Sequence, residues 1–425
     1  MRRLLLTVVS TGLFLLSFSQ QVLKEASPAS AGFSADKLKA IDQLIQSYID
    51  SNYIGGATAI IARDGKIVYY KGLGYDDITT RQPMKRDEIF RIASQSKAIA
   101  AVAVLILVDE GKLKLTDPVA RFLPEFKNQV VLDSFYAADT TYTTVPAKRE
   151  VTIRDLMTHS SGIGYAQIGS KEANAIYAKH GIPGGIGIYN ISLSEKMRIL
   201  GTLPLMHQPG ERWTYGLNMD LMGYLVEVIS GQSFDEFLRK KIFLPLGMKD
   251  TYFYLPENKY NRLVRLNTED SLGHVIPHPD SIYLNGYVFA NYPASKGTYY
   301  SGGGGLSSTA YDYAIFMQML LNEGQYNGVR ILKPATTKMM STDQLPDIAW
   351  GDMKMGLSFG IHTEESHSRS PLSPGSYEWG GMFSSTFWID PKQKIVAQLF
   401  LNQYPNTHNE IHEKFQQRVY DALIK

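Results

Sequence analysis

A serine and a lysine three residues apart are the strongest candidates for chemistry in this sequence. Ser94 and Lys97 open an apolar run over residues 98–108, and Gly111 ends it. A helix that is apolar on every face is buried inside a domain. Residues three apart on a helix have Cβ atoms ~5–6 Å apart. The pattern therefore predicts that both side chains lie on one face at the N-terminus of a buried helix.

This pairing suits nucleophilic catalysis. A serine hydroxyl needs a base, and burial at the positive end of a helix favours the neutral amine that could serve as one. The backbone N–H of Ser94, free at the helix start, could donate to an oxyanion. The same residues also fit a capping serine followed by a lysine that reaches out to solvent. The pair alone leaves both interpretations open.

A tyrosine forms the second candidate. Tyr215 stands before Gly216 and an apolar-periodic segment. Its phenol, held near two cationic groups, could relay a proton to a leaving group. The alternative is an aromatic residue of the core.

The third candidate is Trp379-Gly380-Gly381-Met382, before a pair of predicted strands. Two glycines allow a substrate to lie close against a strand edge, and the N–H of Met382 could be a second oxyanion donor. The alternative is a bulge beside a core tryptophan.

In order and spacing, these three stretches resemble the serine β-lactamase and penicillin-binding protein superfamily, in its class C and esterase branch. The resemblance covers nearly the whole mature chain and includes residues 151–162, 208–210 and 301–308. It implies that Ser94 is the nucleophile, Lys97 the base and Tyr215 the tyrosine of the Tyr-x-Asn motif. Trp379-Gly380-Gly381 then stands in the place of Lys-Thr-Gly.

The sequence departs from that pattern at two positions. Leu217 replaces the motif asparagine. Asn218, one place on, remains a candidate substrate contact, although its position would point it elsewhere. Trp379 replaces a lysine that helps bind a substrate carboxylate, a charge-assisted contact worth ~1.5–3 kcal/mol. Both departures resemble the family VIII-type esterases, which have Trp-Gly-Gly here.

The resemblance implies a serine hydrolase that cleaves ester or amide bonds of a small molecule through an acyl-enzyme, without cofactor or metal. A β-lactamase or D-alanyl-D-alanine carboxypeptidase acting on cell-wall peptides is the alternative within the same chemistry. A non-catalytic penicillin-binding-type recognition domain is the alternative of another class.

A competing nucleophile lies in Gly356-Leu357-Ser358-Phe359-Gly360, which fits the G-x-S-x-G elbow of α/β-hydrolases. Asp390 and then His408 or His412 follow in the required chain order. The elbow also needs a helix after the serine, and the polar, proline-ended segment 361–374 disfavours one. We expect Ser358 to lie in a strand.

Other polar clusters are weaker. His274 and His278 are four apart, but Pro277 and Pro279 disfavour the helix that would make them metal ligands. His159 is expected in a structural turn. Gly302–Gly305 lack the Lys-Ser/Thr ending of a phosphate loop and are expected to pack closely against the active-site helix.

Secondary-structure signals predict how these residues are positioned. Ser34 can cap a helix, Asp64-Gly65 joins two strands between residues 57 and 70, and residues 385–389 and 395–401 read as strands before a closing helix over 411–423. These signals predict a sheet assembled from both chain ends, and the resemblance implies an α/β (α+β) fold of the β-lactamase/transpeptidase type. An antiparallel sheet would be built from both chain ends (residues 34–104 and 291–425), with flanking helices and a mostly helical region over 105–290. Residues 133–148 read as a long loop or an exposed hairpin.

Composition narrows the setting. The 425 residues carry a net charge of +2 and no cysteine, which excludes disulfides, thiolate catalysis and a lipidated N-terminal cysteine, and gives no sign of nucleic-acid binding. Residues 1–19 read as a signal peptide and 20–33 as a linker. We expect a secreted bacterial protein, periplasmic or extracellular, without stable membrane insertion once the signal is removed. The sequence does not indicate the oligomeric state.

Overall fold

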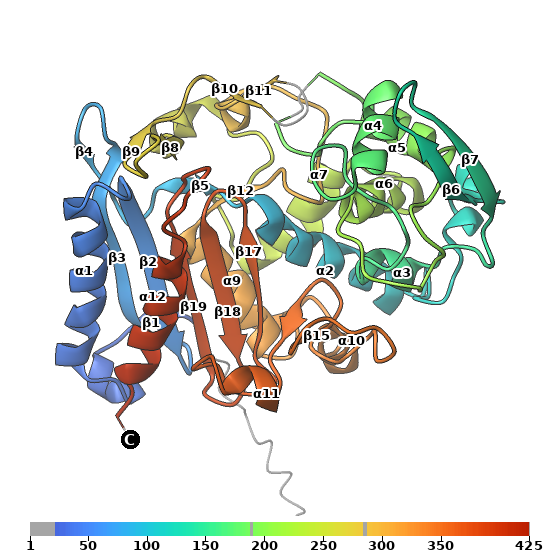
Figure 1. Ribbon diagram of the computed structural model, residues 1–425. Coiled ribbons are helices and arrows are strands. Elements are labelled where there is room, and N and C mark those ends of the chain that lie inside the picture. The colour runs from blue at the N-terminus through green and yellow to red at the C-terminus, as the bar shows by residue number, and fades with distance from the viewer. Residues whose placement is uncertain (1–21, 188–189, 284–286, 425) are drawn as a thin grey trace, which may run out of the picture.

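Strands from the two ends of the chain meet in one sheet. The computed structural model describes residues 22–187, 190–283 and 287–424, so the expected signal peptide lies outside the described residues. The sheet order is β1-β3-β2-β19-β18-β17-β16-β15, with β4 beside β3 (Figure 1). The bounds are β1 Lys24–Glu25, β2 Gly56–Arg63, β3 Lys66–Asp77, β4 Gln82–Pro83, β15 Lys354–Met355, β16 Gly360–Ile361, β17 Tyr377–Gly381, β18 Ser385–Asp390 and β19 Ile395–Phe400.

The predicted fold class is confirmed, with one refinement. The β2–β3 turn places Asp64 at φ 51° and Gly65 at φ 73°, the conformation that an Asp-Gly hairpin requires. β18 and β19 form the predicted C-terminal hairpin, and β19 pairs antiparallel with β2, which joins the two chain ends. β1 pairs with β3 in parallel, so the sheet is mixed rather than wholly antiparallel.

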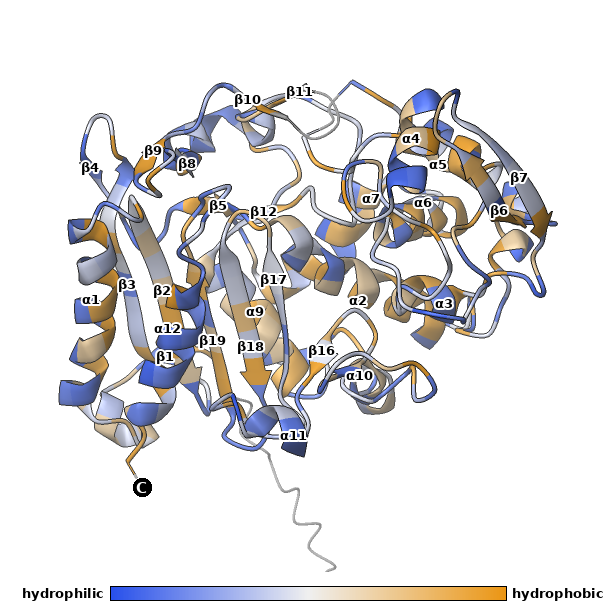
Figure 2. Cartoon of the chain, viewed as in Figure 1, coloured by the Kyte–Doolittle hydropathy of each residue, from blue (hydrophilic) through white to orange (hydrophobic). Residues whose placement is uncertain are grey.

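Amphipathic helices cover one face of the sheet and apolar helices the other. α1 (Ala35–Asp50) begins at the predicted cap, where Ser34 accepts from the N–H of Lys37, and packs beside α12 (Glu410–Asp421). Figure 2 shows the hydrophobic side of α1 toward the neighbouring strands. On the other face, α2 (Ser96–Asp109) and α9 (Ala310–Leu321) lie in the main core. Both are apolar nearly all round, as expected for helices between two layers.

The middle of the chain forms the helical part of the molecule (Figure 1). Residues 133–148 fall largely within an exposed hairpin, one of the two predicted alternatives. The elements here are β6 Val130–Tyr136, β7 Thr141–Pro146, α3 Ile153–Met157, α4 Lys171–Lys179, α5 Leu193–Gly201, α6 Asn218–Ser230, α7 Phe234–Leu238, α8 Leu244–Leu246, β8 Asn267–Glu269, β9 Val275–Pro277, β10 Ser281–Tyr283 and β11 Tyr287–Phe289. The remaining short elements are β5 Ile89–Arg91, β12 Ser307–Thr309, β13 Gln325–Tyr326, β14 Val329–Arg330, α10 Pro334–Met340 and α11 Glu364–His367.

The segment predicted to be a linker is folded where it is described. Within residues 22–33, β1 extends the sheet, a 3-10 turn follows at Pro28–Ala31, and Leu23 and Phe33 are buried. The Ser/Ala/Pro composition indicated a flexible chain, but pairing with the edge of β3 and burial of apolar side chains outweigh that local preference. No helix in the described ranges combines the length and apolar character needed to cross a bilayer.

Candidate active site

The start of α2 brings Ser94 and Lys97 together. Ser94 lies in a 3-10 turn, Ala93–Gln95, that leads into the helix, and Ala93 adopts φ 42°. The Lys97 side chain is fully buried, and its Nζ lies 3.1 Å from Ser94 Oγ. Lys97 Nζ also donates to the carbonyl of Gly303 at 2.6 Å. Lys97 therefore does not reach out to solvent. Its Nζ lies within proton-transfer distance of the Ser94 hydroxyl.

Tyr215 completes a triangle of polar groups around the serine. Its hydroxyl donates to Ser94 Oγ at 2.7 Å, and Lys97 Nζ lies 4.6 Å from the centre of its ring. Gly216 makes this position possible, because a Cβ there would lie 1.9 Å from the carbonyl of Ile163. Tyr215 is thus more than a core aromatic residue, since its phenol contacts the candidate nucleophile.

Strand β17 runs close against the turn that carries Ser94. A Cβ on Gly381 would lie 2.4 Å from the carbonyl of Ile92, so glycine is required for this approach. Met382 follows directly and lines two cavities together with Ser94 and Tyr215. This position is compatible with the predicted use of the Ser94 and Met382 amides as oxyanion donors.

Two cavities meet at Ser94. The larger, about 480 Å³, is lined by Trp379, Gly380 and Gly381 and by a polar end made of Ser384, Ser385, Thr386, Asn409 and His412. The smaller, about 160 Å³, is more enclosed. Its walls are mostly apolar and aromatic: Tyr165, Ile168, Ile186, Met382 and Tyr404. A carbonyl carbon at Ser94 could therefore carry one substituent into each cavity.

Aromatic rings form a wall beside the larger cavity. Trp379 stacks on Trp350 with ring centres 6.0 Å apart and planes 7° apart, and Trp213 stacks on Tyr215 at 5.6 Å. Trp213 and Trp350 also touch, at 5.8 Å. Trp379, which stands where the family motif has a lysine, is thus part of a flat, apolar surface.

Comparison with known proteins identifies the family. The family model described as Beta-lactamase matches residues 41–421. The chain belongs to this family. It is 32% identical over 378 residues to Protein Rv1367c of Mycobacterium tuberculosis, covering 85% of this chain and 89% of that protein. It is 28% identical to Esterase EstB of Burkholderia gladioli, covering 88% and 93% of the two chains.

The solved structures agree on the fold. The structure titled "EstCE1, a hydrolase with promiscuous acyltransferase activity" superposes with a TM-score of 0.77 at 23% identity, covering 90% of this chain and 98% of that one. Family membership makes this protein a hydrolase related to β-lactamases, with esterases among its relatives.

Asn218, predicted as a substrate contact, does not reach either cavity. Its side chain is fully buried. Its Oδ1 accepts a hydrogen bond from the Ser161 hydroxyl at 2.6 Å, and its Nδ2 lies 2.9 Å from His159 Nδ1. The residue is the first of α6, and the helix turns it inward beneath Tyr215. The prediction that Asn218 binds substrate is therefore wrong, and its contacts are structural.

His159 lies in a turn, as expected, and supports the tyrosine. Its backbone carbonyl accepts from the N–H of Thr214 at 2.7 Å, and its ring lies 5.0 Å from that of Tyr215. Burial, and then the charge of Lys97, holds the pKa of His159 well below its usual range. The ring is therefore neutral and adds no cation to the site.

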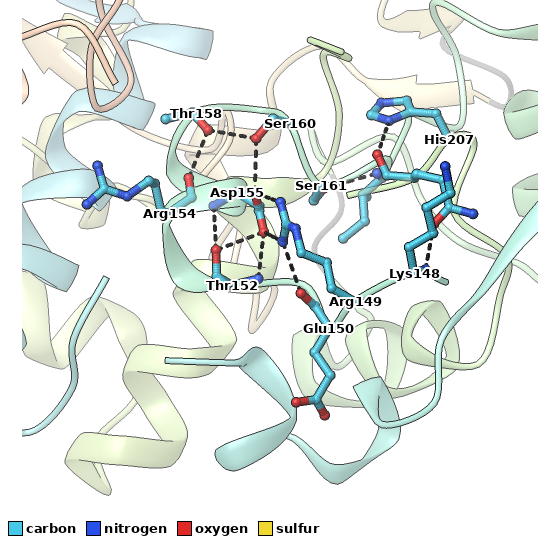
Figure 3. Close-up of polar contacts among 12 residues, drawn as sticks. Lys148, Arg149, Glu150, Thr152, Arg154, Asp155, Thr158, Ser160, Ser161 and His207 are labelled. Atoms are coloured by element: carbon cyan, nitrogen blue, oxygen red, sulfur yellow. Dashed lines mark hydrogen bonds and ion pairs between the residues drawn. The ribbon is translucent and has the colours of Figure 1, made fainter. Parts of the chain in front are cut away.

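A polar network centred on Asp155 holds the turn that contains His159 and Ser160. Arg149 donates to both oxygens of Asp155 at 2.5 and 2.8 Å, and Asp155 also accepts from the N–H and hydroxyl of Thr152 at the start of α3 (Figure 3). Ser160 donates to the same carboxylate at 3.3 Å. The ion pair thus fixes both the cap of α3 and the turn beneath Tyr215.

Ser358 and His274 lie outside the site. Ser358 was predicted in a strand but lies in the turn between β15 and β16 at φ 67°, because the two strands here are only two residues long. His274 lies beside β9 and contacts Asp270, with no helix present. Among the described residues, no three His, Asp or Glu side chains gather as metal ligands would.

Two contributors to the site were not predicted. The Gly303 carbonyl orients Lys97, and a backbone acceptor leaves no trace in residue type. Asp220 is fully buried on α6, and the charge of Lys97 acts to lower the pKa of its carboxyl group, against the larger effect of burial. An acidic residue within an otherwise apolar stretch, five positions after Tyr215, was the available signal.

Proposed function

We propose that this protein hydrolyses carboxylic esters of small, uncharged molecules through an acyl-enzyme on Ser94. The observation that carries the proposal is the partly buried triangle in which Ser94 Oγ lies 3.1 Å from Lys97 Nζ and 2.7 Å from the Tyr215 hydroxyl, at the junction of two cavities. A pure recognition domain needs neither a base nor a phenol beside its serine.

The chemistry follows from this arrangement. Ser94 Oγ attacks the ester carbonyl carbon as its proton passes to the Lys97 amine, and the carbonyl oxygen becomes an oxyanion held by the Ser94 and Met382 amides. Collapse breaks the bond to the alkoxy oxygen, which takes a proton through Tyr215 and leaves as the alcohol. Water then adds to the acyl-Ser94 carbonyl by the reverse proton path and releases the acid.

The charge of the larger cavity favours esters over cell-wall peptides. Among the described residues that line it, none is Lys or Arg. Burial lowers the pKa of His412 to about 4, so this ring is neutral at pH 7. A terminal substrate carboxylate would find no cationic partner there, whereas an uncharged alcohol could pack on Trp379 and hydrogen-bond at the polar end.

The two cavities differ in the part of the ester that each suits. The wide, open one gives the alcohol a way out and water a way in. The enclosed one suits the acyl group, which stays attached between the two steps. An apolar cavity of about 150 Å³ can hold benzene, so the volume of about 160 Å³ favours an acyl group of roughly that size.

A substrate panel tests the proposal. We expect p-nitrophenyl esters of short and benzene-sized acids to be turned over far faster than a cephalosporin or a D-Ala-D-Ala peptide, with turnover lost in Ser94→Ala. If the peptide or the cephalosporin were turned over faster than the esters, the protein would instead be a carboxypeptidase or a β-lactamase. Ester turnover retained by Ser94→Ala would refute the mechanism itself.

We also propose that the protein is exported with removal of the segment expected to be a signal peptide. The positively charged start and apolar stretch of residues 1–19 support this, as does the folding of the chain onto the sheet from Leu23 onward. N-terminal sequencing of the protein from periplasm or medium tests it, and an intact Met1 in cytoplasmic material would contradict it.

A further inference from the structure

One buried carboxyl group beside the site is not used in the mechanism above. Asp220 lies on α6, has no exposed surface, and neither of its oxygens has a regular hydrogen-bond partner within the described ranges. Burying a carboxyl group without such partners is costly. A carboxyl group in this setting therefore requires an explanation other than packing.

The position of Asp220 beside Gly303 offers an explanation for its burial. If Gly303 carried a Cβ, that atom would lie 2.4 Å from Asp220 Oδ2, so the carboxyl is pressed against the residue whose carbonyl accepts from Lys97 at 2.6 Å. Gly185 lies farther away but still in contact range, with its hypothetical Cβ 3.4 Å from both carboxyl oxygens. The carboxyl thus lies directly behind the backbone that orients Lys97.

The groups facing Asp220 are few. Lys97 on α2 faces it and becomes a cation once it takes up a proton, and the hydroxyls of Ser301 and Tyr299 approach it without regular hydrogen-bond geometry. Tyr165 faces it as a further titratable group, and burial keeps the pKa of that phenol well above its usual range. The strongest electrostatic partner that the surroundings offer to an Asp220 carboxylate is therefore the Lys97 ammonium.

We infer that Asp220 is a positioning residue whose negative charge stabilises the Lys97 ammonium as it forms during attack by Ser94. The inference rests on the proposed function and adds a fourth group behind the triangle. Its logic parallels that of a buried aspartate behind a catalytic histidine, which stabilises the protonated base without taking the proton itself. No proton moves to Asp220, and the atoms of the acylation step balance as before.

The charge of Asp220 gives the inference a pH signature. Burial raises the pKa of this carboxyl to about 6, against the opposing effects of Ser301, Lys97 and Tyr299. Below that pH the group takes up a proton and loses its charge. Acylation in the wild type is therefore expected to fall as the pH drops through about 6.

The decisive variant is Asp220→Asn, which keeps the shape and removes the charge. Asp312→Asn is a matched control. Asp312, on α9, is also a buried carboxyl whose pKa burial raises to about 6, but it accepts hydrogen bonds from the Asp250 N–H and the Thr251 hydroxyl. We expect kcat/KM for a p-nitrophenyl ester to fall about 100-fold in Asp220→Asn, with loss of the acid limb near pH 6. Asp312→Asn should keep both the rate and the limb.

Further measurements distinguish a rate lost through lower stability from a rate lost through removal of the Asp220 charge. Thermal unfolding is followed for both variants, and Asp220→Glu, which restores the charge, should recover part of the rate. An Asp220→Asn enzyme that is folded and keeps the wild-type rate and pH profile would overturn the inference. An equal loss in both variants that follows their stability would also overturn it. Ester turnover by Ser94→Ala would instead refute the proposed function, so the two failures are distinguishable.

Discussion

Ser94 and Ser358 both stand at sharp backbone turns, and each belongs to a motif of a known hydrolase type. Ala93, before the first serine, has φ 42°, and Ser358 itself has φ 67°. Ser94 lines two cavities and contacts Lys97 and Tyr215. Ser358 is buried, and its hydroxyl donates to the carbonyl of Met157 at 3.3 Å and contacts the sulfur of Met219 at 3.7 Å.

The elbow partners of Ser358 also lie elsewhere. Asp390 accepts from the Tyr420 hydroxyl at 2.7 Å, His408 stacks on Tyr53, and His412 lies 3.1 Å from the Ser384 hydroxyl. A nucleophilic serine needs an adjacent base and access for the substrate. Ser94 has both in this structure, whereas Ser358 has only a strained turn and partners in the right chain order, so we infer that Ser94 is the nucleophile.

The largest effect expected on the Ser94 side comes from Lys97→Met, which removes the base while keeping an unbranched side chain in the buried site. We expect kcat/KM to fall by about 10³–10⁴-fold, the upper range for general-base catalysis. Steady-state kinetics with a p-nitrophenyl ester measure this loss. Retention of a tenth or more of the wild-type value would show that another group activates Ser94.

A smaller loss is expected for Tyr215→Phe. The ring and its stacking on Trp213 remain, but the hydroxyl that lies 2.7 Å from Ser94 Oγ is gone. We expect kcat to fall about 100-fold with KM little changed, because the phenol serves proton transfer rather than binding. A rise in KM with kcat unchanged would instead assign the tyrosine to substrate binding.

Substitutions around Ser358 are expected to lower the free energy of unfolding rather than kcat/KM. Ser358 packs on the end of α3, whose N-terminal capping box is formed by Thr152 and Asp155, and Asp155→Asn breaks the ion pair with Arg149. Because Arg149 is 44% exposed, we expect a loss of about 2 kcal/mol in the free energy of unfolding, less than for a fully buried pair. Urea denaturation measures this loss, and a kcat/KM that fell far more than stability would contradict a structural role.

This stability difference should depend on pH. Although burial opposes it, hydrogen bonds from Arg149 and Thr152 lower the pKa of the Asp155 carboxyl. A carboxyl whose folded-state pKa is depressed contributes stability above its unfolded pKa of about 3.9 and loses it as the pH falls through the folded value. The gap between wild type and Asp155→Asn should therefore be full at pH 7 and shrink in acid. A constant gap would mean that the charge of Asp155 is not what stabilises the turn.

The smallest effect is expected for Ser358→Ala. The hydroxyl makes one weak bond inside the core, so stability should change by about 1 kcal/mol or less, and kcat/KM should stay within about twofold of the wild type. Loss of turnover in this variant with retention in Ser94→Ala would reverse the comparison and restore the elbow mechanism.

Much of the active site could be predicted because its signals are local. The three-residue spacing of Ser94 and Lys97 on an apolar helix, and the glycines beside Tyr215 and Trp379, carry their geometry in the sequence itself. The hairpins around Gly65 and between β18 and β19 were predictable for the same reason, since turn residues and strand patterns act over a few positions.

Other features depended on what each residue meets across the fold. Asn218 follows the tyrosine motif by one place, yet the turn of α6 points it inward to Ser161 and His159. The start of the chain looked like a linker by composition, yet the edge of β3 recruits it. Ser358 was expected in a strand, yet its neighbouring strands are too short to include it.

The sequence by itself determined the candidate nucleophile and the candidate base, since their spacing lies on one short apolar stretch. The order of the three motifs, through the family that they resemble, also indicated the type of fold. Only the tertiary structure brought Tyr215 and the Gly303 carbonyl to Lys97 and Ser94, which lie more than a hundred residues away from them in the chain. Only the tertiary structure placed Asp220 behind them. Contacts at such separation depend on how helices and sheet pack, and no local pattern specifies that packing.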